Sequence, residues 1–306
     1  MVTLNVKNRA RGSEVSGNGR AIPPQMTLAD RISLSGKGLH SGREATVVVH
    51  PAPENTGIVF SNGGETIHGL ASNVVDTSRG TTIGRNGTRV RTIEHLMAAL
   101  RGTGVDNALV EVSGPEIPAL DGSALPYVEA ITEVGKVELA QPRQTVAISD
   151  PVWLQRNGSF ILAVPSSELR ITYVMNYDHP LIGSQSATYV LREGEFRGEL
   201  APARTFVLYE EVAELLDNDL ARGGSLDNVI VVWRDKLSSN LRFPDELARH
   251  KIVDLLGDLS LVGGLLQAEV LAVKSGHALN VDFAKEVQRV ASAKSESNLA
   301  FVGAVS

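Results

Sequence analysis

Short β-rich runs alternate with amphipathic stretches along the chain after residue 24. β-Branched residues in half-buried runs favour strands, and apolar residues spaced three and four apart favour helices. The strands predicted in this way lie at residues 45–50, 57–60, 108–112, 145–148, 151–154, 159–164, 169–176, 187–191, 228–233 and 268–273. The predicted helices lie at residues 92–102, 124–134, 209–220, 245–262 and from 281 onward. The mixture of both element types predicts an α/β or α+β fold.

Two Asn-Gly turns punctuate the first half, at residues 62–64 and 86–87. Each lies between β-compatible runs. Asn-Gly is typical of tight hairpin turns because both central residues need positive φ. We therefore expect two hairpins here.

The chain divides at a polar segment that contains a proline, residues 139–143. It precedes a fresh series of strands, which is typical of a domain boundary. Residues 1–25 lack the apolar core of a signal peptide and are rich in Arg, Gly, Ser and Pro, so they predict a flexible arm. We expect a first domain at 26–141 and a second at 142–306. Their similar element content predicts two related α/β layers that face each other.

Composition limits the metal ligands, the partners and the membrane segments that this chain can have. The 306 residues include no cysteine, so any metal must be held by His, Asp or Glu. The 35 acidic and 29 basic residues give a net charge of −6, which argues against a nucleic-acid partner. The most apolar region, residues 255–273, is interrupted by Asp258, Gln267 and Glu269, so no transmembrane segment is expected. We expect a soluble, cytoplasmic protein.

The helix predicted at 245–262 carries a polar stripe. His250, Asp254 and Asp258 are spaced four residues apart and therefore share one face. Because the rest of the helix is rich in leucine and valine, this stripe would be costly to bury without a partner. A metal ion is one such partner, since His-x-x-x-Asp aims a nitrogen and an oxygen at the same point. A plain His–Asp hydrogen bond is the other, and for this helix alone it is the commoner explanation.

The helix predicted at 92–102 favours a metal ion over a plain hydrogen bond, because Glu94 and His95 lie in its first turn. An open zinc site needs three protein ligands plus a water, whose pKa falls to about 7. His95, His250 and Asp254 meet that count without cysteine. Glu94 would then be the general base, although a first-turn Glu can also simply favour the helix dipole. We favour the catalytic interpretation.

A further candidate, His277, lies in a Ser-Gly-His turn between a strand and a helix. If Asp258 reaches it, the carboxylate would raise the pKa of His277 and keep the imidazole charged. It could then stabilise an oxyanion and protonate a leaving amine, whereas a loop-capping role is the alternative. The glycine-rich run at 36–42 lacks the spacing of a phosphate-binding loop, and no G-x-S-x-G elbow accompanies Ser275.

Taken together, these motifs resemble the UDP-3-O-acyl-N-acetylglucosamine deacetylase family, the zinc amidases of lipid A biosynthesis. The resemblance runs in the family's order from about residue 32 to about residue 290. The segments that carry it are GKGLHSG, PAPENTGIVF, TIEHLMAALRGTGVDN, GPEIPALDGSALPYV, YDHPLIGSQ, ARTF, ARGGSLDNVIVV, HKIVDLLGD and KSGHALN.

The resemblance implies a role for each matching residue. It implies zinc ligation by His95, His250 and Asp254, with Glu94 as base and His277 as acid. It also implies that Asp258 orients that histidine and that Thr205 stabilises the oxyanion. The resemblance also implies that three residues contact the substrate: Lys251, Phe206 and Gly276.

The fold implied by the resemblance is α+β, with two α/β two-layer sandwich domains packed face to face, each with a small insert. The second insert would be a strand-helix-strand near residues 203–232, whose apolar helix face would form a passage for the acyl chain. The implied reaction releases acetate from UDP-3-O-acyl-N-acetylglucosamine, and we expect a monomer. The alternatives are a zinc amidase acting on another acylated amino sugar and a metal-free binding protein of the same fold.

Overall fold

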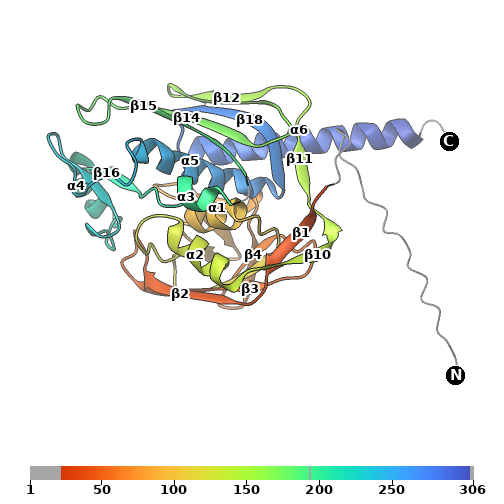
Figure 1. Ribbon diagram of the computed structural model, residues 1–306, viewed down its shortest axis with the longest axis horizontal. Coiled ribbons are helices and arrows are strands. Elements are labelled where there is room, and N and C mark those ends of the chain that lie inside the picture. The colour runs from red at the N-terminus through yellow and green to blue at the C-terminus, as the bar shows by residue number, and fades with distance from the viewer. Residues whose placement is uncertain (1–21, 193, 304–306) are drawn as a thin grey trace.

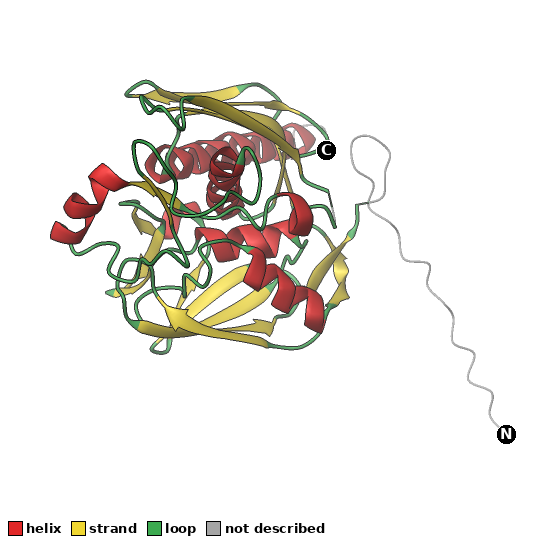
Figure 2. Cartoon of the chain, turned by 60° about the vertical axis from the view of Figure 1, so that its left-hand side comes forward, coloured by secondary structure: helices red, strands yellow, loops and turns green. Residues whose placement is uncertain are grey.

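Two β-sheets form the outer layers of the molecule, and the main helices lie between them (Figure 1). This arrangement is seen in a computed structural model that describes residues 22–192 and 194–303. Figure 2 shows most of the helices in the middle, with a large sheet on either side and one helix at the left edge. Each sheet therefore buries one face against helices, and the α+β architecture predicted from the sequence is confirmed.

The first half builds its sheet in the order β2-β3-β9-β4-β5. Alternate side chains of each strand point inward, as Val47 and Val49 do, and both are fully buried. The strands are β2 (Ile32–Lys37), β3 (Glu44–Pro51), β4 (Ile58–Asn62), β5 (Glu65–His68) and β9 (Ala108–Ser113). The covering helices are α1 (Glu94–Gly102) and α2 (Leu125–Val134).

The second half repeats this topology in the order β12-β13-β18-β14-β15. In both sheets the central strand, β9 or β18, pairs antiparallel with one neighbour and parallel with the other. The strands are β11 (Thr145–Ala147), which also pairs with β18, β12 (Val152–Arg156), β13 (Ser159–Pro165), β14 (Arg170–Asn176), β15 (Ser184–Val190) and β18 (Leu265–Val273). The helical segments are α3 (Phe196–Glu199), α5 (Glu246–Leu259), the short 3-10 helix η2 (Ser260–Val262) and α6 (His277–Gly303).

Each half carries a small insert between its fifth strand and its first long helix. The first insert follows the 3-10 helix η1 (Ala71–Asn73) and is an antiparallel sheet of β6 (Val74–Asp76), β7 (Thr82–Arg85) and β8 (Thr88–Val90). The second insert consists of β16 (Phe206–Leu208), α4 (Tyr209–Asp217) and β17 (Ile230–Val232), with its two strands parallel. It stands out at one end of the molecule in Figure 1.

The two predicted hairpins are confirmed. The turn between β4 and β5 uses Gly63 and Gly64 at positive φ, and the turn between β7 and β8 uses Asn86 and Gly87 at φ 48° and 84°. The final helix was predicted to begin at residue 281, but α6 begins at His277. The helix predicted at 245–262 ends as the 3-10 turn η2.

The sequence prediction lacks several strands, among them β2, β6 and one further strand pair. β1 (Pro24–Leu28) pairs antiparallel with β10 (Lys136–Pro142). Gln25 is buried, so the last residues of the predicted arm belong to this strand, while residues 1–21 lie outside the described part of the chain. β10 runs into the predicted boundary at 139–143, and the division into domains at that point stays a prediction. Within the described residues, no helix is long and apolar enough to cross a membrane.

Candidate active site

The candidate site forms where the two halves meet, at the crossing of α1 and α5. Gly257 of α5 lies against the backbone of Glu94, and a Cβ atom at this glycine would overlap the Glu94 carbonyl oxygen. The missing side chain therefore lets the helices approach backbone to backbone. This close approach brings the first turn of α1 beside the polar stripe of α5.

Three buried side chains from these helices offer their donor atoms to one point. The Nε2 atoms of His95 and His250 lie 3.4 and 3.3 Å from Oδ1 of Asp254. Nδ1 of His250 donates a hydrogen bond of 3.0 Å to the Ala203 carbonyl, which leaves Nε2 free to act as a ligand. One ligand atom from each residue lies within 4.8 Å of the others, so the three could hold a metal ion.

The protonation of His250 and Asp254 suits metal binding. Burial lowers the pKa of His250 to about 4, against the opposing charge of Asp254, so the imidazole is neutral. Burial raises the pKa of Asp254, but His250, Lys251 and a hydrogen bond from His95 outweigh it and hold that pKa well below its usual range. Lys251 Nζ donates to the other carboxylate oxygen at 2.7 Å. A neutral nitrogen and an ionised oxygen are the forms that bind a cation.

A second group of buried titratable side chains adjoins these three. Nδ1 of His277 lies 2.9 Å from Oδ2 of Asp258, and Nε2 lies 4.0 Å from Oε1 of Glu94. Burial lowers the pKa of His277, but Asp258 and Glu94 raise it more, so that it reaches about 9. Burial raises the pKa of Glu94. The pair therefore combines a charged imidazole with a carboxyl group poised to take up a proton.

Two residues that sequence reasoning missed hold this group in place. The Thr81 hydroxyl donates to Oδ1 of Asp258 at 2.6 Å, and its backbone N–H donates to Glu94 at 2.9 Å. The Asn280 amide donates to Oδ2 of Asp258 at 2.9 Å. Asn280 stands three residues after His277 in the first turn of α6, a spacing that a correct helix start would have revealed. Thr81 lies in a loop with no periodic signal.

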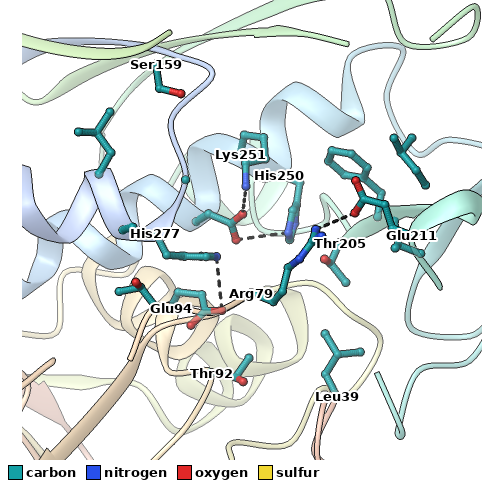
Figure 3. Close-up of a pocket in the computed structure, with 18 of the residues that line it drawn as sticks. Leu39, Arg79, Thr92, Glu94, Ser159, Thr205, Glu211, His250, Lys251 and His277 are labelled. Atoms are coloured by element: carbon teal, nitrogen blue, oxygen red, sulfur yellow. Dashed lines mark hydrogen bonds and ion pairs between the residues drawn. The ribbon is translucent and has the colours of Figure 1, made fainter. Parts of the chain in front are cut away.

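Both groups face a cavity of about 430 Å³ (Figure 3). Of the residues predicted for the site, only Asp258 is absent from its lining, because it lies fully buried behind His277. The predicted residues that line it are Glu94, His95, Thr205, Phe206, His250, Lys251, Asp254, Gly276 and His277.

A second cavity of about 350 Å³ adjoins the first and extends beneath the second insert. Val212 and Leu215 of α4 and Val229 and Val231 near β17 contribute apolar side chains to it. Thr205 and Phe206 line both cavities, so the two cavities adjoin at the start of β16.

Comparison with known proteins shows which family the chain resembles. The family model described as UDP-3-O-acyl N-acetylglycosamine deacetylase matches residues 25–289. A UDP-3-O-acyl-N-acetylglucosamine deacetylase of Chlamydia caviae is 42% identical over 272 residues, which cover 87% of this chain and 97% of that protein. A deacetylase of the same name from Oleidesulfovibrio alaskensis is 43% identical over 269 residues, 86% of this chain and 88% of that protein.

The chain belongs to the UDP-3-O-acyl N-acetylglycosamine deacetylase family. The resemblance read from the sequence motifs is thereby confirmed. Membership in this deacetylase family makes the protein a hydrolase acting on an amide. The individual residue roles implied by the resemblance stay predictions, although the contact between Asp258 and His277 on which one of them depends is present.

Proposed function

We propose that this protein hydrolyses the acetamide of UDP-3-O-acyl-N-acetylglucosamine in lipid A biosynthesis, with zinc as its metal. The observation that carries the proposal is the convergence of His95, His250 and Asp254 with Glu94 and His277 on one cavity. Two nitrogens and one oxygen suit Zn²⁺ and leave a coordination position open. When bound, zinc supplies a Lewis acid and lowers the pKa of water to about 7.

Glu94 is the general base in this proposal. Its carboxylate lies in the cavity beside His95, fixed by the Thr81 N–H. It accepts a proton from the water that attacks the acetyl carbonyl carbon. Burial raises its pKa and so makes it a stronger base than an exposed carboxylate.

His277 is the proposed acid. Its Nε2–H faces Glu94 and the cavity, while Nδ1–H donates to Asp258. The charged ring stabilises the oxyanion, with help from the Thr205 hydroxyl. As the carbon–nitrogen bond breaks, His277 gives its proton to the leaving amine, and the products are acetate and the UDP-3-O-acyl-glucosamine.

In this proposal the two adjoining cavities hold the two ends of the substrate. Lys251, Phe206 and Gly276 line the first cavity and are the proposed substrate contacts. The apolar cavity beneath α4 is the proposed passage for the acyl chain, because aliphatic side chains line it. A cytoplasmic location and a monomeric state stay predictions.

The deciding experiment measures bound zinc per chain and acetate release from the UDP-sugar. We expect about one zinc per chain and a loss of about 10²- to 10⁴-fold in turnover for Glu94→Ala. A native protein without metal would favour the metal-free binding protein. Zinc binding with release of acetate only from another acylated amino sugar would favour the related amidase.

A further inference from the structure

The two inserts are joined by an ion pair at the mouth of the site. Nη1 of Arg79 donates to Oε2 of Glu211 at 2.7 Å (Figure 3). Arg79 lies in the loop between β6 and β7 of the first insert, and Glu211 lies in the first turn of α4 of the second. The side chains are 48% and 32% exposed, so they meet at the surface. The pair connects residues 132 positions apart in sequence.

The backbone around Arg79 is anchored independently of this ion pair. Arg79 has a φ of 62°, a left-handed conformation that is unfavourable for a non-glycine residue. Its carbonyl accepts a hydrogen bond of 3.0 Å from Nε2 of the buried His40. Nδ1 of His40 in turn accepts the N–H of Ala221, at 3.3 Å, in the loop that follows α4. The second insert is thus tied to the Arg79 loop both directly and through His40.

Arg79 also stands at the junction of the two cavities. The residues that line both of them are Leu39, Arg79, Thr205, Phe206 and Val207. Arg79 is the charged residue among these five, and it lies where a ligand that occupied both cavities would cross from one to the other. The ion pair lies beside that junction and joins the Arg79 loop to α4, whose Glu211 lines the first cavity.

We propose that the Arg79–Glu211 ion pair is a clasp that closes the passage around the acyl chain and so sets the preference for acyl length. This inference rests on the proposed function. An exposed ion pair contributes little to folding. It can nevertheless matter for binding, because an enclosed chain loses more water contact than a chain in an open groove, and each buried methylene strengthens binding by about fourfold. The clasp therefore strengthens the binding of substrates with long acyl chains.

The test is a series of UDP-3-O-acyl substrates with increasing acyl length, assayed for acetate release with wild type, Arg79→Ala and Glu211→Ala. In wild type, kcat/KM should rise steeply with acyl length. In either variant KM for the longest substrate should rise about 10-fold with little change in kcat, and the shortest substrate should respond within about twofold. The charge-reversed double variant R79E/E211R should recover most of the long-chain affinity, and Arg79→Lys should retain part of it.

Arg289→Ala is the matched control. Arg289 forms an exposed ion pair of 2.7 Å with Glu286 in α6, away from both cavities. This variant should leave the dependence on acyl length unchanged. Thermal unfolding of all variants checks that each is folded.

Several results would overturn the clasp. An equal loss at every acyl length would make Arg79 a general substrate contact. An unchanged length dependence, or purely additive effects in R79E/E211R, would show that the ion pair does not close the passage. Calorimetric Kd values for the same series need no turnover and should show the same dependence on acyl length. Failure of the wild type to release acetate counts against the proposed function, whereas failure of the clasp leaves wild-type release intact.

Discussion

The two halves of the molecule share one topology yet make different contributions to the site. α1 precedes the central strand β9 as α5 precedes β18, and these two equivalent helices cross at the centre. α1 contributes only the adjacent Glu94 and His95 from its first turn. α5 contributes residues over two turns, and α6 supplies His277. The repeated fold places two helices against each other, and the polar residues at their contact form the proposed active site.

The two inserts also make different contributions to the site. The first is a small antiparallel sheet packed against β4 and β5, and its loop between β6 and β7 holds Thr81 in a fixed position. The second exposes large apolar side chains, with Tyr209, Leu216 and Leu226 each about half exposed or more at 54%, 48% and 60%. The first insert therefore supports the groups proposed to be catalytic, whereas the second leaves apolar surface at which we propose that a ligand binds.

The largest expected effect comes from removing Asp254, one of the two ligands that α5 contributes to the proposed metal site. Asp254→Ala should lower acetate release by about 10³-fold or more and reduce bound zinc, because one of three ligands is lost. Asp245→Ala is the control near the start of the same helix, since it breaks only a partly exposed pair with Arg249. Full zinc content and turnover in Asp254→Ala would show that α5 does not supply this ligand.

The next effect tests the close crossing of the two helices. Gly257→Ala should push Glu94 away from α5, lowering activity about 10²-fold and stability by about 1 to 3 kcal/mol. The control is Gly198→Ala in α3, where a Cβ atom would meet nothing within 4 Å. Activity and denaturant midpoints are measured for both. Equal behaviour of the two variants would contradict the role of the crossing.

The pH dependence of kcat/KM tests the role proposed for His277, the residue that α6 contributes to the site. In the proposed mechanism His277 is the acid and must be protonated. Its pKa is raised to about 9, so kcat/KM should fall as pH rises through about 9. In Asp258→Asn the carboxylate that raises this pKa most is gone, so the fall should begin at lower pH. A basic limb at the same pH in both enzymes would rule out His277 as its origin.

The smallest effect tests the support from the first insert. Thr81→Val leaves Asp258 without one buried hydrogen bond and should cost about 1 to 3 kcal/mol of stability and about 10-fold in activity. Thr172→Val removes an exposed hydroxyl contact with Thr188 and should cost less than about 0.5 kcal/mol. Unfolding curves and kinetics are compared. Indistinguishable variants would mean that Thr81 does not support the site.

Features that depend on local spacing could be predicted from the amino-acid sequence alone. The stripe of His250, Asp254 and Asp258 follows from helical period, the hairpins follow from their Asn-Gly turns, and the absence of cysteine restricts the metal donors. The family motifs added the remaining roles. The β1–β10 pair escaped prediction because its partners are far apart in the chain and its strands have weak periodicity.

Which of these groups meet depends on the tertiary structure. Glu94 and His95 reach the α5 stripe because Gly257 admits a close helix crossing, a contact that no local pattern encodes. Thr81 reaches Asp258 across 177 residues, and Arg79 reaches Glu211 across 132. Side-chain period is a property of one element, whereas juxtaposition depends on the packing of many. The sequence therefore indicated the principal site residues, and the contacts made by Thr81, Asn280 and Arg79 were decided by the tertiary structure.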